Sequence, residues 1–263
     1  MKVALAQLNP EADLELDCDT ACSVIGSRRD ADLILFPELF LGGYSTGDPG
    51  SVATSPEGPE IQAIGEACAG SGSAAIVGFT ERLEGEGFAN SAALLTGDGA
   101  LAGIYRKTNL FGAGEKAAYR QGDSLLVAPL AGWSVGTQIC FDVEFPEPSR
   151  LMSLAGAGIL ATISSNMEPY AADHRLAARA RALDNRLPHL YVNRVGSESG
   201  HVFTGESCVI ASDGSVIAGL DRQEDILEYE IESGSAGTET SYLELLRTDL
   251  EVIVQENANG GEA

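Results

Sequence analysis

Short apolar segments alternate along the chain with longer segments in which apolar residues recur every three or four positions. The short segments are typical of buried strands, and the longer ones of helices with one buried face. Strands are predicted at residues 3–8, 33–36, 75–80, 92–95, 101–106, 125–128, 135–141, 159–164, 190–195, 207–211 and 226–231. Helices are predicted at residues 14–29, 59–69, 148–155, 174–186 and 242–247.

This alternation predicts an α/β protein with layered sheets and helices. Turn sequences at 96–99 (Thr-Gly-Asp-Gly) and 212–215 (Ser-Asp-Gly-Ser) lie between predicted strands, so antiparallel pairs should join the sheets. No linker rich in Pro, Gly or Ser divides the chain. We therefore expect a single domain at 1–256, followed by a frayed tail at 257–263.

The charge of the chain excludes some classes of partner. Sixteen Lys and Arg residues against 39 Asp and Glu residues give a net charge of −23, which disfavours binding to nucleic acids and to anionic membranes. No apolar run reaches the roughly 18 residues of a membrane span, and the first residues turn acidic too early for a signal peptide. Five cysteines without an export signal indicate free thiols. A cytoplasmic location is expected.

Three sequence motifs could carry chemistry. The first places Glu38 directly after an apolar strand, in Phe-Pro-Glu. A carboxylate at the carboxyl end of a buried strand suits a general base, although a surface glutamate is an equally reasonable interpretation. The second places Lys107, one of three lysines in the chain, just after a predicted strand. It could stabilise an oxyanion or be simply solvated.

The third motif is Gln-Ile-Cys-Phe-Asp, where Cys140 follows a strand and precedes a proline-containing turn. Backbone N–H groups at such a turn should lower the pKa of the thiol and could bind an oxyanion, so Cys140 is the candidate nucleophile. A buried structural thiol is the alternative, and it suits Cys68 and Cys208 better.

Other motifs are absent or out of context. The chain has neither a G-x-S-x-G elbow nor a P-loop. The three histidines lie in unrelated sequence contexts and form no zinc pattern with cysteine. A cysteine–histidine protease would need long-range pairing that the sequence does not indicate. No metal site is predicted.

Taken in order, Phe36-Pro-Glu38, Tyr105-Arg-Lys107 and Ile139-Cys-Phe-Asp142 resemble the motifs of the nitrilase superfamily of carbon–nitrogen hydrolases. The resemblance extends over nearly the whole chain and also includes the segments at 2–7, 41–44, 109–115, 165–167, 179–185 and 193–196. It implies an α-β-β-α sandwich with mixed sheets, of the kind that forms four layers on association. It also implies a homodimer or larger homo-oligomer.

The resemblance further implies roles for individual residues. Glu38 would be the general base, Lys107 the oxyanion stabiliser, Cys140 the nucleophile and Glu115 a fourth, substrate-orienting residue. The backbone N–H of Phe141 would assist Lys107. Phe141, Glu144, Tyr44 and Asn166 are the expected substrate-binding residues. The implied reaction needs no cofactor.

Phe141-Asp142 after the cysteine resembles an amidase branch, because nitrilases usually have Trp-Glu there. Related branches that take carboxylate substrates tend to have Arg where this chain has Glu144. An acidic residue there favours neutral or amine-bearing amides, and Glu168 could add to an acidic pocket, although both glutamates could instead be merely exposed. The expected function is therefore an amidase acting on short primary amides. A nitrilase, an N-carbamoyl amine hydrolase and an inactive binding module are the alternatives.

Overall fold

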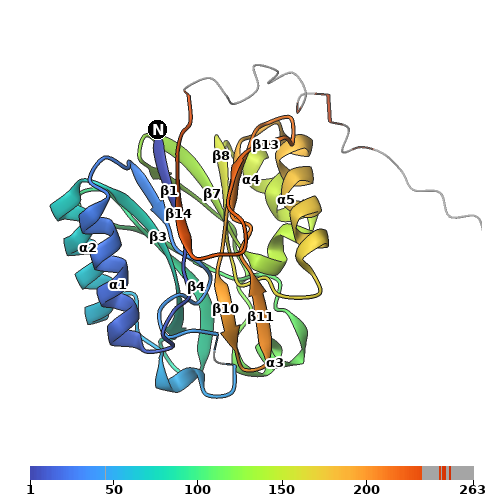
Figure 1. Ribbon diagram of the computed structural model, residues 1–263. Helices are drawn as coiled ribbons and strands as arrows, with labels where there is room; N and C mark the ends of the chain where they lie inside the picture. The colour runs from blue at the N-terminus through green and yellow to red at the C-terminus, as the bar shows by residue number, and fades with distance from the viewer. Residues whose placement is uncertain (45, 233–242, 244, 247–248, 250–263) are drawn as a thin grey trace, which may run out of the picture.

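The computed structural model describes residues 1–44, 46–232, 243, 245–246 and 249, and it contains two six-stranded sheets (Figure 1). The first sheet has the order β14-β1-β2-β3-β4-β5 and consists of β1 (Lys2–Gln7), β2 (Leu33–Leu35), β3 (Ala74–Arg82), β4 (Phe88–Leu95), β5 (Leu101–Arg106) and β14 (Asp225–Glu230). The second has the order β13-β12-β9-β8-β7-β6 and consists of β6 (Leu126–Leu130), β7 (Trp133–Ile139), β8 (Ile159–Ser164), β9 (His189–Asn193), β12 (Cys208–Ile210) and β13 (Val216–Gly219). Strands β10 (Val195–Glu198) and β11 (His201–Thr204) form a separate hairpin.

Helices cover the outer faces of both sheets (Figure 1). The helices are α1 (Leu14–Ser27), α2 (Pro59–Ser71), α3 (Gly112–Ala118), α4 (Pro146–Leu154) and α5 (Ala171–Asn185), with 3₁₀ turns η1 (Pro49–Ser51) and η2 (Cys140–Glu144). Helices α1 and α2 lie beside the first sheet, and α4 and α5 beside the second (Figure 1). The layers therefore run α-β-β-α, as the resemblance to the nitrilase superfamily implies.

Apolar packing between the layers accounts for this arrangement. One buried cluster joins the two sheets and includes Leu5 and Leu35 from the first sheet and Ile139, Ile163 and Val192 from the second. A second cluster packs α1 and α2 against the first sheet, and smaller ones lie beneath α4 and α5. Burial of this apolar surface is the main favourable contribution to such a fold.

The two sheets share one pairing pattern. In the first, β1-β2-β3 are parallel and β14, β4 and β5 join antiparallel. In the second, β7-β8-β9 are parallel and β6, β12 and β13 join antiparallel. The halves thus have the same layout. The tripeptide Phe-Pro-Glu occurs twice, at 36–38 and 145–147, but at unrelated places in the two halves: the first copy follows the middle parallel strand β2, and the second follows η2 at the start of α4.

All eleven predicted strands correspond to strands of the structure, and four of the predicted helices are present. The strand predicted at 135–141 ends two residues too late, because β7 ends at Ile139 and Cys140 begins η2. The sequence analysis missed α3, β10, β11 and β13. Half of the helix predicted at 242–247 (residues 242, 244 and 247) and the whole tail at 257–263 fall outside the described residues. Within the described part of the chain, no helix combines the length and apolarity needed to cross a membrane.

Candidate active site

The candidate site lies where the two sheets meet at strand ends. Glu38 follows β2, Cys140 follows β7 and Ser165 follows β8, and the carboxyl ends of parallel strands are common positions for active sites. Lys107 follows β5 of the first sheet, and Glu115 lies in α3. Each sheet therefore contributes part of the site.

Three donors surround the Glu38 carboxylate, which is fully buried. Lys107 Nζ lies 2.6 Å and Asn90 Nδ2 2.7 Å from Oε1, and the Ser165 N–H donates to Oε2 at 2.8 Å. Asn90 was not identified from the sequence, where it is one polar residue inside an apolar strand. These contacts fix the orientation of the carboxylate.

A glycine in β3 allows the Glu38 segment to reach this position. A Cβ atom at Gly78 would lie 2.4 Å from the Pro37 carbonyl oxygen and 2.7 Å from the Glu38 Cα. Such contacts are far inside van der Waals distance with backbone atoms, so only glycine fits here.

Lys107 bridges two carboxylates in the protein interior. Its Nζ atom is 2.6 Å from Glu38 Oε1 and 2.9 Å from Glu115 Oε1. Burial lowers the pKa of Lys107, but the charges of Glu115 and Glu38 outweigh it and hold that pKa well above its ordinary value. Burial raises the pKa of Glu115, and Lys107 opposes this shift. Tyr44 donates to Glu115 Oε1 at 2.6 Å and the Phe111 N–H to Oε2 at 2.8 Å.

Cys140 adopts a backbone conformation that is unusual for a non-glycine residue. Its φ is 46°, at the sharp change from β7 to η2. Strained conformations of this kind cluster at functional sites. Burial, followed by the charge of Glu38, raises the pKa of the Cys140 thiol well above its ordinary value, although Lys107 opposes the shift. The expectation of a lowered thiol pKa is therefore wrong, because desolvation and a nearby carboxylate outweigh the backbone N–H groups.

Asp142 connects the Lys107 segment to the Cys140 segment. Its buried carboxylate accepts hydrogen bonds from the Tyr105 hydroxyl at 2.7 Å, the Thr108 hydroxyl at 3.0 Å, the Asn109 N–H at 2.7 Å and the Ile139 N–H at 3.0 Å. Burial raises the pKa of Asp142, and the hydrogen bond from Tyr105 opposes that shift. The loops that carry the lysine and the cysteine are thereby held together.

A small cavity adjoins Cys140 and is lined by all four residues expected to bind substrate. Its walls are Tyr44, Phe111, Glu115, Cys140, Phe141, Glu144, Ser165, Asn166, Met167, Tyr170 and His174. Tyr44 contacts Glu115, and the backbone N–H of Asn166 donates to Asn193 Oδ1 at 2.8 Å. Glu168 does not line this cavity; it lies on the surface with Arg222. The idea that Glu168 contributes to an acidic pocket is therefore wrong.

His174, which the sequence analysis did not select, lies beside the candidate nucleophile. Its Nε2 atom lies 3.9 Å from Cys140 Sγ and 3.6 Å from Glu144 Oε1, and Nδ1 is 2.9 Å from the Tyr191 hydroxyl. Burial, with a smaller contribution from Lys107, lowers the pKa of His174 to about 3, so the imidazole is neutral at neutral pH. The two residues are 34 positions apart in the chain, and no local pattern connects them.

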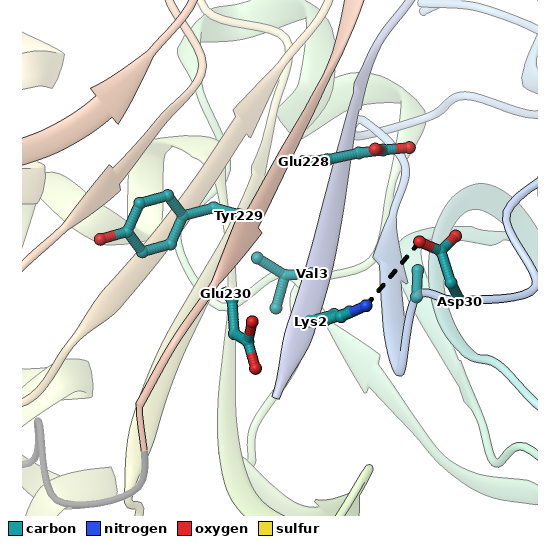
Figure 2. Close-up of a pocket in the computed structure, with 7 residues that line it drawn as sticks. Lys2, Val3, Asp30, Glu228, Tyr229 and Glu230 are labelled. Carbon is teal, nitrogen blue, oxygen red and sulfur yellow. Dashed lines mark ion pairs between the residues drawn. The ribbon is translucent and has the colours of Figure 1, made fainter.

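Figure 2 shows a different depression, lined by residues of β1, of β14 and of the loop before β2. It contains Lys2, which forms an ion pair with Asp30 at 4.0 Å, and the side chains of Glu228, Tyr229 and Glu230. No cysteine or histidine lines it. Among the described residues, no group of three or more His, Cys, Asp and Glu side chains is arranged to hold a metal ion. The cavity beside Cys140 is accordingly the candidate site.

Comparison with known proteins identifies the family. The chain matches the carbon–nitrogen hydrolase family over residues 2–238. An (R)-stereoselective amidase from a Pseudomonas species is 34% identical over 238 residues, 88% of this chain and 86% of the relative. A nitrilase from Pyrococcus abyssi is 32% identical over 226 residues, 83% of this chain and 84% of the relative.

A solved structure gives the same result. A glutamate-to-glutamine mutant of an amidase from Nesterenkonia matches with a TM-score of 0.81 and 26% identity over 94% of each chain. That structure shows the acetamide moiety of fluoroacetamide added covalently at the active-site cysteine. The chain belongs to the carbon–nitrogen hydrolase family, and the resemblance seen in its sequence is confirmed.

Proposed function

We propose that this protein is an amidase that hydrolyses short aliphatic primary amides to a carboxylic acid and ammonia. The observation that carries the proposal is the buried ion cluster of Glu38, Lys107 and Glu115 beside a cavity that opens onto Cys140. The cavity beside Cys140 is small and has mostly apolar walls, which favours a short acyl chain.

In the first half of the proposed reaction, Glu38 accepts the thiol proton of Cys140 while the sulfur forms a bond to the amide carbon. The high thiol pKa requires a base at the moment of attack, because little thiolate exists beforehand. The carbonyl electrons move to oxygen, where Lys107 and the Phe141 N–H stabilise the negative charge. Glu38 then gives its proton to the amide nitrogen, the C–N bond breaks and ammonia leaves a thioester.

In the second half, a water molecule gives a proton to Glu38, and its oxygen attacks the thioester carbon. Collapse of this intermediate breaks the C–S bond, and Glu38 returns the proton to the sulfur. Glu115, held by Tyr44, keeps Lys107 charged and in place. Phe141 and Asn166 form walls that position the acyl group.

The test is an ammonia-release assay with acetamide, propionamide and butyramide, in wild type and in Cys140→Ala. We expect release by wild type and a loss of at least about 1000-fold in the variant. Cys68→Ala is the matched control, because Cys68 is buried in the packing of α2 and lies outside the cavity. Ammonia release that survives Cys140→Ala would refute the proposal, and inactivity of wild type on all three amides would favour the inactive binding module.

A nitrilase is the second candidate, supported by the 32% identity to the Pyrococcus abyssi nitrilase. The same assay with propionitrile distinguishes it, because a nitrilase releases ammonia from the nitrile. An N-carbamoyl amine hydrolase would release carbon dioxide together with ammonia from a carbamoyl substrate. We expect the nitrile and the carbamoyl substrate to be hydrolysed no faster than the amides.

We also propose that the chain forms a homodimer or larger homo-oligomer. Four leucines on the outer helices support this: Leu151 and Leu154 on α4, and Leu176 and Leu183 on α5, are between 41% and 67% exposed. Exposed apolar side chains on adjoining helices are typical of an interface. Light scattering after gel filtration should give at least twice the 27.4 kDa chain mass, and Leu176→Glu should reduce it. A monomeric wild type would refute this.

A further inference from the structure

We propose that the cavity recognises amides that carry an ammonium group one or two carbons from the carbonyl, with Glu144 as the counter-ion inside a wall of aromatic rings. This inference rests on the proposed amidase function and specifies its substrate class. It is carried by three features of the cavity: an uncompensated carboxylate, three aromatic side chains and the short span from that carboxylate to the sulfur.

Glu144 is the carboxylate of the cavity that the Lys107 cluster does not use. Its side chain is 31% exposed, and its one ion-pair contact among the described residues is with His174 at 3.6 Å. Because His174 is neutral, that contact does not compensate the charge. Burial, followed by the nearby charge of Asp173, raises the pKa of Glu144. A bound cation would offset the cost of burying the Glu144 charge and the repulsion between Glu144 and Asp173.

Aromatic side chains surround the same space. Phe111 lies edge-to-face with Phe141 at 5.3 Å and with Tyr170 at 5.5 Å between ring centroids, and all three line the cavity. Aromatic faces attract ammonium groups, and the attraction is strongest where water is excluded. A carboxylate together with aromatic rings is a combination suited to an organic ammonium ion. The wall would hold a carboxylate-bearing substrate poorly, since its fixed charge is negative.

The position of Glu144 limits the length of the substrate. Glu144 Oε1 and Cys140 Sγ both lie within 4 Å of the same atom, His174 Nε2. A molecule whose carbonyl carbon is at the sulfur and whose ammonium group is at Glu144 therefore needs only a short connection. One or two carbons between the carbonyl and the amine satisfy this geometry, as in α-amino and β-amino amides.

The test compares three amides of similar size that differ in the charge at the far end: β-alaninamide (cationic), butyramide (neutral) and succinamate (anionic). We expect wild type to have a kcat/KM for β-alaninamide at least about tenfold above that for butyramide, with succinamate lowest. In Glu144→Gln, which keeps the shape and removes the charge, this ratio should fall about tenfold. Phe111→Leu should lower the same ratio by a smaller factor.

Glu168→Gln is the matched control, because Glu168 is a surface carboxylate paired with Arg222 and should leave all three values unchanged. Equal kcat/KM for β-alaninamide and butyramide in wild type would overturn the inference while leaving the amidase proposal intact. An equal loss on both substrates in Glu144→Gln would also overturn it, since a structural role affects them alike. If wild type hydrolyses none of the amides, the proposed function itself fails.

Discussion

His174 contacts the sulfur of Cys140 without being able to act as its base. A base must take up a proton near neutral pH, whereas burial holds the pKa of this imidazole at about 3. The sulfur of Cys140 and a carboxylate oxygen of Glu144 both lie near Nε2, so an N–H at Nε2 suits both. His174 would then orient the sulfur as a positioning residue.

We therefore expect His174→Gln to lower kcat about fivefold, the equivalent of one neutral hydrogen bond, without changing the pH profile. Rates measured between pH 5 and 8 should show no inflection near 6.5 in wild type. His189→Gln is the control, because His189 is equally buried but contacts Thr162 and the Ala178 carbonyl instead. An inflection near pH 6.5 that disappears in His174→Gln would show that this residue titrates and contradict the expectation.

His189 itself makes stability depend on pH. Burial lowers its pKa to about 4, whereas the unfolded chain has a histidine pKa of about 6.5. Between these values the unfolded state binds the additional proton, so the stabilisation is complete above pH 6.5 and is lost as the pH falls toward 4. The advantage of wild type over His189→Gln in unfolding free energy should shrink by up to about 1.4 kcal/mol per pH unit in this window. Urea titrations at pH 7, 6, 5 and 4 measure it, and a constant difference would contradict it.

Single residues also show what could be predicted from the sequence. Glu38, Lys107 and Cys140 were selected because each follows an apolar strand, and strand ends converge in an α/β fold. The structure brings Glu38, Lys107 and Glu115 into contact, and Cys140 and Glu115 line the same cavity. His174 and Asn90 could not be selected, because their contacts with Cys140 and Glu38 join distant parts of the chain. The direction of the pKa shift of the Cys140 thiol also depends on burial of the side chain, which a local sequence pattern does not reveal.

Among the secondary-structure elements, strand β3 approaches the segment after β2 closely at Gly78. Gly78→Ala would place a Cβ atom 2.4 Å from the Pro37 carbonyl oxygen, so the Glu38 segment must move. We expect a loss of about 1–3 kcal/mol in unfolding free energy and a nearly complete loss of amide hydrolysis. Gly70→Ala, in α2 with no atom within 4 Å of the new Cβ, is the control and should raise stability by about 0.5–1 kcal/mol. Normal activity in Gly78→Ala would contradict the close fit.

The loops after β5 and β7 depend on Asp142 for their relative position. Asp142→Asn keeps the shape but places an N–H₂ group where N–H and O–H groups now donate. We expect kcat to fall about 10- to 100-fold while KM changes little, because displacement of Lys107 relative to Cys140 impairs the chemical step. Tyr105→Phe removes only one of these donors and should cost less. If the two variants show equal losses, Asp142 does not hold the loops together.

Element prediction succeeded where hydrophobic patterns are strong. The parallel strands, buried on both faces, were all found, and so were the four longest helices. The missed hairpin of β10 and β11 is polar and Gly-containing, with mostly exposed or half-exposed residues. The missed helix α3 has seven residues, two of them glycine, and it matters because it carries Glu115. Its position depends on tertiary contacts, among them the hydrogen bonds that Glu115 accepts from Tyr44 and Lys107.

For the whole molecule, the core between the sheets determines how the chain unfolds. One buried cluster contains residues of both sheets, so neither sheet can open without exposing apolar surface of the other. We propose on this basis that both halves belong to one domain and unfold in a single transition. A Leu35→Ala substitution, in β2 of the first sheet, should then lower the unfolding free energy by about 2–5 kcal/mol and destabilise both sheets equally.

Trp133, the single tryptophan of the chain, begins β7 in the second sheet. Its fluorescence therefore reports on the unfolding of the second sheet, whereas Leu35 lies in the first. In Leu35→Ala, the transition seen by tryptophan fluorescence should coincide with that seen by calorimetry and shift by the same amount. Leu16→Ala removes the same atoms from an exposed position on α1. It should change the unfolding free energy measured by either method by no more than about 0.5 kcal/mol. A fluorescence transition that stays at the wild-type temperature while an earlier calorimetric peak appears would mean that the sheets unfold separately, and the chain would then contain two domains.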